Sequence, residues 1–215
     1  QNRVSKILNN QEVGLPWLGT FHSICAKILR RHAKAVNLNQ NFTIIDQDDQ
    51  LRLIKSICNA ENIDIKKIAP NFIISLINKW KNLGWYPNDV VLKKSESLEK
   101  NLLKIYRIYQ IKLTELNACD FGDLILHCVS IFEKNLDINK MYSNNFKYIL
   151  VDEYQDTNFV QSKWLNLLVG NDQNICCVGD DDQSIYSWRG AEIKNFLEFD
   201  KIYKNTKVIR LEQNY

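Results

Sequence analysis

The adjacent carboxylates Asp152 and Glu153 directly follow the apolar run 148–151. A buried strand that ends in carboxylates at the edge of a parallel sheet is how α/β nucleotide hydrolases hold Mg²⁺ and position a water. The same pair also suits a strand that leaves a core through a polar turn, which is the commoner meaning of an isolated Asp-Glu. The pair by itself leaves both interpretations open.

A second apolar run, 174–178, is followed by Gly179 and the acidic triplet 180–182. The segment between the two runs is long enough for a helix, so the pattern predicts strand, helix and strand, with each strand ending in an acidic turn. We expect the two turns to form one active-site edge. Asp180 could support a metal ion there, and the triplet could equally be a solvated turn.

Two aromatic residues, Tyr186 and Trp188, lie two positions apart beside Arg189. Bases of single-stranded DNA stack on such rings for about 1–3 kcal/mol each, with little dependence on base sequence. Both rings could equally belong to a hydrophobic core. Their spacing alone does not decide between DNA contact and packing.

Thr20, His22 and Ser23 lie where the pattern predicts that a strand, 16–21, enters a helix, 23–36. A phosphate at such a junction could use the hydroxyl groups and the free backbone N–H groups of the helix start. Thr20 or Ser23 could instead only cap the helix. These residues alone leave both interpretations open.

The bulk composition limits the class of protein. The chain has 215 residues, 45% of them hydrophobic, and a formal net charge of +3, which does not by itself identify a nucleic-acid partner. Its six cysteines lack Cys-x-x-Cys spacing and form no zinc pattern with the three histidines, which favours a reducing cytosol. Without a long apolar run or a signal peptide, we expect a cytoplasmic protein that has no membrane partner.

Periodicity and capping residues predict the secondary structure. Asp46 and Asp120 are expected to cap helices, and Gly84 is expected to end one. The pattern then changes to alternating strands and helices. The predicted helices include 2–10, 23–36, 47–59, 69–83, 97–116 and 120–132, and the predicted short strands include 16–21, 42–45 and 207–211.

These elements predict an α/β layer, residues 1–37 and 119–215, that is interrupted by a mostly helical insert, residues 38–118. Basic residues of the insert could meet DNA phosphates, although lysines on a helical surface are usually only solvated. These residues are Lys66, Lys67, Lys79, Lys81, Lys93 and Lys94.

Five segments occur in the order found in the UvrD-like superfamily-one DNA helicases, the UvrD, PcrA and Rep group. The chain resembles this family over essentially its whole length, and the combination is highly specific. The resemblance implies part of a RecA-like P-loop NTPase parallel-sheet domain with a helical inserted subdomain. One departure is Gly122, where an acidic residue is commoner. The segments are Thr20–Ser23, Asp120–Leu124, Val151–Asn158, Gly179–Ala191 and Leu211–Tyr215.

The resemblance implies a site for ATP and Mg²⁺. Asp152 would hold the metal ion, and Glu153 would orient and deprotonate the attacking water. Gln155 and Gln183 resemble glutamines that sense the γ-phosphate, a task that suits an amide because it can donate to phosphate and accept from water without changing charge. The other implied nucleotide-binding residues are Asp180, Gln213 and Tyr215, whose counterpart stacks on adenine.

The resemblance also implies single-stranded DNA and junctions of single- and double-stranded DNA as partners. The segment around Thr20 would touch the DNA backbone, Trp188 would stack on a base, and Arg189 would tie the DNA and ATP sites together. The implied DNA-binding residues are Thr20, Phe21, His22, Tyr186, Trp188 and Arg189.

A phosphate-binding loop, G-x-x-x-x-G-K-[ST], is absent from the sequence. Residues 14–20 have the glycine spacing but lack the lysine, and Pro16 and Trp17 suit such a loop poorly. The resemblance places this Walker A segment upstream of Gln1, and a catalytic arginine and a second motor domain beyond Tyr215. We therefore expect a piece of a 3′-to-5′ ATP-driven translocase that, without the remainder, binds ATP very weakly and does not unwind DNA.

Two other functions remain as alternatives. A truncated, non-catalytic remnant that only binds single-stranded DNA would have no use for Glu153. A metal-dependent nuclease would hold two ions with Asp152, Glu153 and Asp180 and would cleave DNA without ATP. The nuclease alternative leaves Gln155 and Gln183 unexplained.

Overall fold

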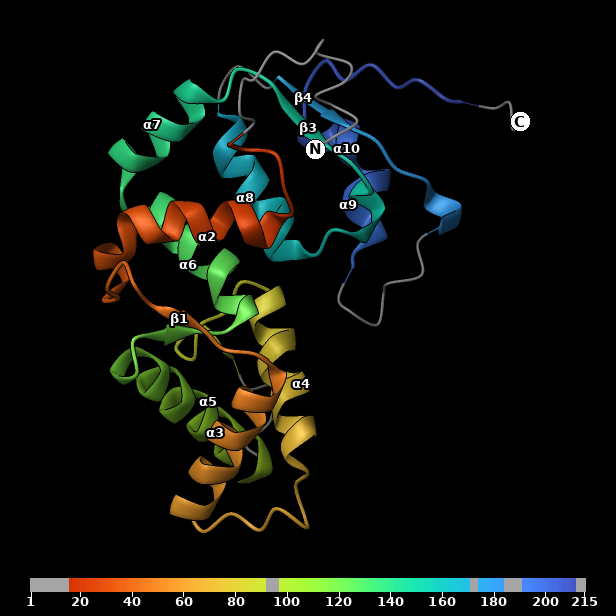
Figure 1. The fold of residues 1–215 in the computed structure, drawn as a ribbon. Helices are drawn as coiled ribbons and strands as arrows, with labels where there is room; N and C mark the ends of the chain where they lie inside the picture. The colour runs from red at the N-terminus through yellow and green to blue at the C-terminus, as the bar shows by residue number, and fades with distance from the viewer. Residues whose placement is uncertain (1–15, 92–96, 171–173, 184–190, 212–215) are drawn as a thin grey trace.

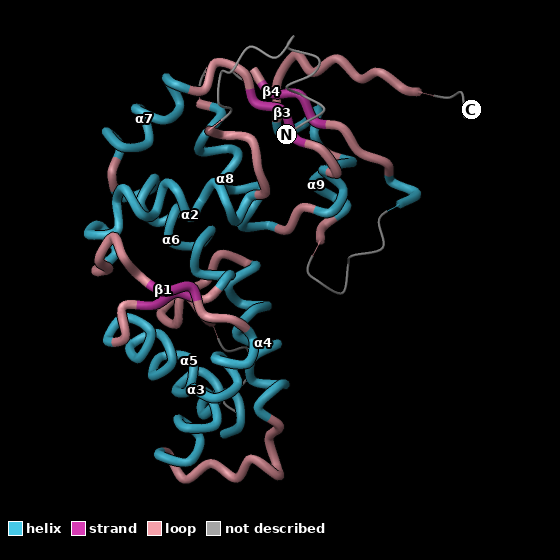
Figure 2. Tube along the Cα trace, viewed as in Figure 1, coloured by secondary structure: helices cyan, strands magenta, loops and turns pink. Residues whose placement is uncertain are grey.

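The computed structural model describes residues 16–91, 97–170, 174–183 and 191–211. Over these ranges the chain is mixed α/β and mostly helical, with two small parallel sheets of two strands each (Figures 1 and 2). Helices α3, α4 and α5 lie together in the lower part of the view, and α2, α6, α7 and α8 lie above them with strands β3 and β4.

The long helices lie close to where the sequence predicts them. The side chain of Asp46 accepts the Asp49 N–H at 2.9 Å, and that of Asp120 accepts the Asp123 N–H at 2.9 Å, so both aspartates cap helices as expected. Gly84, with φ +76°, follows the end of α4. The helices are α2 (Phe21–His32), α3 (Gln47–Ala60), α4 (Pro70–Asn82), α5 (Ser97–Glu115), α6 (Phe121–Lys134), α7 (Leu136–Asn145), α8 (Phe159–Val169), α9 (Ile193–Leu197) and α10 (Phe199–Ile202).

Each sheet pairs strands that are distant in sequence. Strand β1 (Thr43–Ile44) runs parallel to β2 (Ala118–Cys119), and β3 (Ile149–Val151) runs parallel to β4 (Ile175–Cys177). Helix α8 connects β3 to β4, which confirms the predicted strand, helix and strand. Three short 3₁₀ helices complete the described elements: Ala33–Val36, Tyr154–Asp156 and Asp181–Gln183.

The strand predicted at residues 16–21 is wrong. Helix α2 already begins at Phe21, and the residues before it form turns. The apolar character of this segment has another cause, because the Trp17 ring packs edge-on against Tyr142 and Phe146, with centroids 5.9 and 5.1 Å away. A short apolar run can thus serve packing without forming a strand.

The strand predicted at residues 207–211 is also wrong. This segment has no strand structure, and Ile209 and Leu211 are 72% and 89% exposed. A strand needs a hydrogen-bonding neighbour, and within the described ranges β3 and β4 pair only with each other. The predicted helix 2–10 lies outside the described residues.

Two hydrophobic cores organise the described residues. The first, here called the main core, joins α2, α6 and α8 and includes Cys25, Ile28, Leu29, Leu124, Ile125, Cys128, Trp164 and Leu165. The second core joins α3, α4 and α5 and includes Ile54, Ile57, Ile73, Ile77, Trp80, Ile105, Tyr106 and Tyr109. None of the described helices is both long enough and apolar enough to cross a membrane.

Strand β3 is buried on one side only. Val151 faces the main core, whereas Leu150 is 79% exposed on the opposite face, and Val178, next to the end of β4, is 55% exposed. The buried strand that was expected before the two carboxylates is thus buried on one face and exposed on the other. The carboxyl end of β3 is nevertheless fixed by the core through Val151, which positions the acidic turn that follows.

Candidate functional site

The carboxyl ends of β3 and β4 bring two acidic turns together. The Val178 N–H donates to the Val151 carbonyl at 2.8 Å, and the Tyr154 N–H donates back to the Val178 carbonyl at 3.0 Å. These bonds continue the parallel ladder beyond the strands and hold residues 152–153 beside residues 179–180. The two turns that the sequence predicts at one edge therefore lie side by side.

Glu153 has an unusual backbone conformation. Its φ of 52° and ψ of 43° place it in the left-handed region, which costs about 1–2 kcal/mol for a residue with a side chain. The Asp152 carboxylate accepts the Glu153 N–H at 3.1 Å, and the fully buried Tyr154 anchors the next position. Such a conformation is typical of functional sites, and here it presents two exposed carboxylates at the end of a strand.

Gln155 connects the two turns. Its amide nitrogen donates to Glu153 Oε2 at 2.7 Å, and its amide oxygen accepts the Asp180 backbone N–H at 3.1 Å. Gln155 is only 1% exposed, and a buried amide needs hydrogen-bond partners within the protein. Glu153 and Asp180 supply these partners at its two ends. Because an amide oxygen and nitrogen are fixed in one plane, this bridge sets where the Glu153 carboxylate lies relative to the second turn.

Asp180 extends the same hydrogen-bonded chain. Its Oδ2 accepts from the Gln183 side-chain nitrogen at 2.6 Å, and its Oδ1 accepts the Asp182 N–H at 3.1 Å. Three hydrogen bonds thus connect four of the predicted site residues in a row: Glu153, Gln155, Asp180 and Gln183. Asp181 and Asp182 lie in an exposed 3₁₀ helix, whereas Asp180, just before it, is partly buried and belongs to the hydrogen-bonded site.

Gly179 is required by the close approach of Gln155. A Cβ at this position would lie 2.5 Å from Gln155 Oε1 and 2.8 Å from a ring carbon of Phe196. Neither neighbour can withdraw easily, because Gln155 is bridged at both ends and Phe196 packs against the main core. The glycine that opens the second turn is therefore a packing requirement of the bridge.

The start of α2 holds the other predicted site residues. The Thr20 hydroxyl accepts the Ser23 N–H at 3.3 Å, so Thr20 does cap the helix. The half-buried Phe21 ring packs edge-on against Trp164 of α8, with centroids 5.9 Å apart. Thr20 and Phe21 therefore have structural tasks, and Thr20 is the more exposed of the two.

His22 meets an aromatic residue that the sequence analysis did not single out. Its ring lies 5.9 Å from that of Phe121, in the first turn of α6, at an interplanar angle of 76°. Burial lowers the pKa of His22, so the imidazole is neutral at neutral pH. Any contact of His22 with phosphate would then use a hydrogen bond rather than a positive charge.

Phe121 is a large apolar side chain in an unexpected environment, since it is 53% exposed. The periodicity of α6 does not reveal this exposure, because Phe121 lies three and four positions before Leu124 and Ile125 and so falls on the same helical stripe as these buried residues. An exposed ring beside His22 extends the surface around the start of α2 with an aromatic face.

Residues 1–204 match the family described as the UvrD/REP helicase N-terminal domain. The chain belongs to this UvrD family.

Relatives agree with this assignment. The chain is 45% identical to a probable DNA helicase II homolog of Rickettsia conorii over 99% of its length, and 46% identical to DNA helicase II of Rickettsia typhi over 99%. It is 43% identical to the ATP-dependent DNA helicase PcrA of Staphylococcus aureus over 100% of its length. These matches cover 33%, 32% and 29% of the relatives, so the chain spans about a third of their length.

Several of the predicted contacts of this UvrD-family chain lie outside the described residues. They are Tyr186, Trp188 and Arg189 for DNA, and Gln213 and Tyr215 for the nucleotide. Their roles stay predictions. The described part of the predicted site consists of the acidic edge at β3 and β4 and the start of α2.

The acidic edge has the donor chemistry that Mg²⁺ requires. Mg²⁺ is usually held by one or two carboxylates, with waters and substrate phosphates as the other ligands. Asp152 is exposed at the strand end, and its Oδ1 accepts the Glu153 N–H. An exposed carboxylate of this kind fits a metal ion that is shared with waters and a phosphate.

Proposed function

We propose that this chain is part of an ATP-dependent DNA helicase or translocase, which couples ATP hydrolysis to movement on single-stranded DNA and to duplex unwinding. Family membership and relatives named DNA helicase II and PcrA support the proposal. The observation that carries it is the hydrogen-bonded chain from Glu153 to Gln183 across the ends of β3 and β4. We further propose 3′-to-5′ movement, action in the cytoplasm and a task in DNA repair or replication.

The proposed architecture is a RecA-like motor domain, residues 1–37 and 119–215, with a helical inserted subdomain, residues 38–118. The separation of the two hydrophobic cores supports this division, because the second core is built from α3, α4 and α5 with neighbouring residues. The parallel strands β3 and β4 with α8 between them are the kind of unit from which such a motor domain is built.

At the proposed ATP site each residue has a distinct task. Asp152 binds Mg²⁺, which neutralises charge on the phosphates when it is bound. Glu153 accepts the proton of the attacking water, and Gln155 holds the Glu153 carboxylate in place at 2.7 Å. Gln183 lies one hydrogen bond further, on Asp180, where its amide could respond to the γ-phosphate.

At the proposed DNA track, Phe121 offers an exposed ring for base stacking and His22 lies against that ring. Thr20, at the exposed N-terminus of α2, offers a helix start to a backbone phosphate. Trp188 and Arg189, which lie outside the described residues, are proposed to bind DNA as well. Helix α8 would then connect the DNA track to the acidic edge, because Phe21, next to Thr20, packs against Trp164 of that helix.

The remainder of the helicase is the proposed partner of this chain. The relatives are about three times as long, and the Walker A segment and a second motor domain would supply the other half of the ATP site. By itself the chain should bind ATP very weakly and should not unwind DNA.

The test is ATP hydrolysis by the longest native polypeptide that contains this chain, with and without single-stranded DNA. We expect strong stimulation by DNA, loss of turnover in Glu153→Gln and retention of DNA binding in that variant. Glu133→Gln is the matched control, because Glu133 forms a surface ion pair with Lys163, away from the acidic edge, and should behave as wild type. A Glu153→Gln variant that hydrolyses ATP at the wild-type rate would contradict the proposal.

A further inference from the structure

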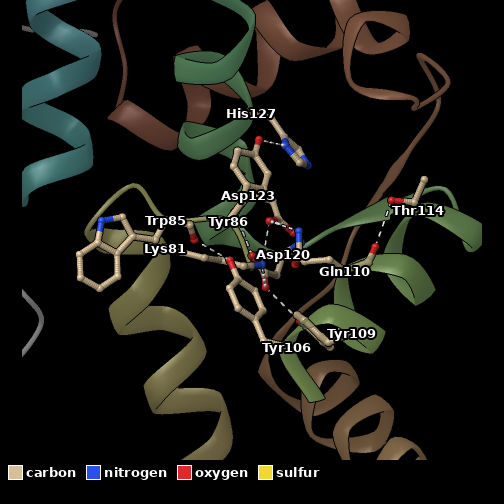
Figure 3. A network of polar contacts seen from close by, with 10 residues as sticks. All are labelled: Lys81, Trp85, Tyr86, Tyr106, Tyr109, Gln110, Thr114, Asp120, Asp123 and His127. Atoms are coloured by element: carbon tan, nitrogen blue, oxygen red, sulfur yellow. Dashed lines mark hydrogen bonds and ion pairs between the residues drawn. The ribbon is translucent and has the colours of Figure 1, made fainter. Parts of the chain in front are cut away.

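Lys81 lies fully buried near the end of α4, although a solvated or DNA-binding role on a helix surface was expected for it. Its Nζ contacts Asp120 Oδ2 at 2.6 Å and Asp123 Oδ1 at 2.7 Å (Figure 3). Burial opposes the charged form, but the two carboxylates outweigh it and raise the pKa of Lys81. Lys81 is therefore an internal cation held by two anions.

Both of these aspartates lie at the start of α6, where Asp120 is the N-cap residue and Asp123 belongs to the first turn. Asp120 Oδ1 accepts the Asp123 N–H at 2.9 Å, and Asp123 Oδ2 accepts the Asp120 N–H at 3.2 Å, which is a reciprocal capping box. The residues between them are Phe121 and Gly122. By holding both aspartates, Lys81 fixes the backbone that presents the exposed Phe121 ring.

Gly122 strengthens this connection. A Cβ on Gly122 would lie 2.9 Å from Lys81 Cδ and 3.2 Å from Lys81 Cβ, so the aliphatic stem of Lys81 lies directly against the α6 turn. The glycine that departs from the family pattern thus permits this close contact. Lys81 holds the turn by packing as well as by charge.

Helix α5 contacts the same buried cluster of Lys81, Asp120 and Asp123, which is here called the joint. Tyr109 donates to Asp120 Oδ2 at 2.9 Å, and Gln110 donates to Asp123 Oδ1 at 3.0 Å (Figure 3). Two helices of the second core, α4 and α5, therefore hold the start of a main-core helix. The position of the Phe121 turn is set by the second core.

The same end of α4 also reaches the helix that follows the acidic turn. Asn82 accepts from the Asn158 side chain at 3.0 Å, and Asn158 caps α8 directly after the turn that contains Glu153. Gly84, just beyond α4, lies against Phe159 and Val160 at the start of α8. Consecutive residues of α4 thus contact the α6 turn that carries Phe121 and the cap of α8, the helix that follows the acidic turn.

The buried ion pairs of the joint fix the position of the α6 turn more than they stabilise the fold. Buried ion pairs commonly add little net stability compared with apolar residues of similar size, whereas removal of one partner is costly. A cation between two carboxylates does impose a specific geometry, because each donor–acceptor contact has a defined direction. The joint therefore defines where the α6 turn lies relative to α4.

We propose that Lys81 is a positioning residue for DNA binding, which acts by holding the Phe121 turn in the orientation that meets single-stranded DNA. The inference rests on the proposed function, since it assumes that Phe121 stacks on a base. It assigns to the buried cation of the helical subdomain a task in the DNA track of the motor.

The test is a double-mutant cycle in the longest native polypeptide that contains this chain, with affinity for a fluorescein-labelled oligo-dT measured by anisotropy. We expect Lys81→Met to weaken binding about tenfold, the order of one lost stacking contact. In a Phe121→Ala background the same change should weaken binding less than twofold, because the ring on which Lys81 acts is absent.

A second variant controls for misfolding of Lys81→Met. Lys81→Met leaves two buried carboxylates without a cation, whereas Lys81→Met/Asp123→Asn restores the wild-type net charge of the joint and should fold more readily. Its effect on DNA affinity should show the same dependence on Phe121. If the Lys81 changes weakened DNA binding equally with and without the Phe121 ring, the positioning role of Lys81 would be wrong, and the proposed function would be unaffected. Absence of DNA binding by the wild-type protein would overturn the proposed function together with this inference.

Discussion

Gln155 and Glu153 form a hydrogen bond of 2.7 Å between the amide nitrogen and the carboxylate, and the same amide accepts the Asp180 N–H at 3.1 Å. The carboxylate proposed as the general base is therefore held from the neighbouring strand end. Movement of the second acidic turn would be transmitted to Glu153 through a single rigid side chain.

Replacement of Gln155 by Glu should test this bridge. A second carboxylate beside Glu153 would repel it and raise its pKa, so the base would be protonated over a wider acidic range. We expect a fall in kcat for ATP hydrolysis of about 10–100-fold with a smaller change in KM, and an acid limb of the pH–rate profile that moves to higher pH.

The matched control for this change is Gln161→Glu. Gln161 accepts the Asn158 N–H in the capping box of α8, and a glutamate can accept the same bond. The control should keep the wild-type pH profile. An unshifted acid limb in Gln155→Glu would show that the bridge does not control Glu153.

Gly179→Ala should disrupt the bridge by volume rather than by charge. The added Cβ would lie 2.5 Å from Gln155 Oε1 and 2.8 Å from Phe196, which is over-packing that costs about 1–3 kcal/mol. We expect a lower thermal midpoint and a lower kcat. Gly19→Ala is the control, because its Cβ would come closest to the exposed Ser23 hydroxyl, which can rotate away with the loss of one exposed hydrogen bond to the Thr20 carbonyl. If both variants kept wild-type kcat, tight packing at Gly179 would have no part in catalysis.

Much of the fold could be predicted from the sequence, because helix periodicity and local capping report directly on backbone structure. Asp46 and Asp120 cap helices where expected, and the strand ends at 151 and 177 lie in register. The strand predicted at 16–21 failed because an apolar run does not reveal what its side chains pack against, here the rings beside Trp17.

The candidate site was harder to predict where partners come from distant segments. The residue types Glu153, Gln155 and Asp180 identified the edge, but the bridge between them depends on how β3 and β4 align. Lys81 illustrates the same limit, since a lysine in a helix predicts a solvated surface. Its burial depends on Asp120 and Asp123, which only the tertiary structure brings within reach.

The thermal stability should fall as pH drops below about 6.5, the ordinary pKa of histidine. Burial lowers the pKa of His127, although Asp123 acts in the opposite direction, and Tyr86 hydrogen-bonds to its Nδ1 at 2.7 Å. The unfolded state then binds more protons than the folded state in this range, so stability is present above the unfolded pKa and is lost on acidification. Each such histidine contributes a slope of at most about 1.4 kcal/mol per pH unit.

His127→Gln should reduce this slope, measured as the thermal midpoint between pH 7.5 and 5.5. His22 and His32 also have lowered pKa values, so a smaller slope should remain. His32→Gln is the comparison, because the nearby Arg31 contributes to the lowered pKa of His32, so this change should remove a separate part of the slope. A pH dependence identical to wild type in His127→Gln would exclude His127 as its source.

Phe121→Ala should weaken binding of single-stranded DNA without loss of the fold. The ring is 53% exposed, so its removal costs little packing, whereas loss of one stacked base costs about 1–3 kcal/mol of binding free energy. The matched control is Phe72→Ala, which removes a ring that is 52% exposed in the first turn of α4. Anisotropy with oligo-dT at fixed salt should show weaker binding for Phe121→Ala alone. Equal affinities for both variants would place the DNA track elsewhere on the molecule.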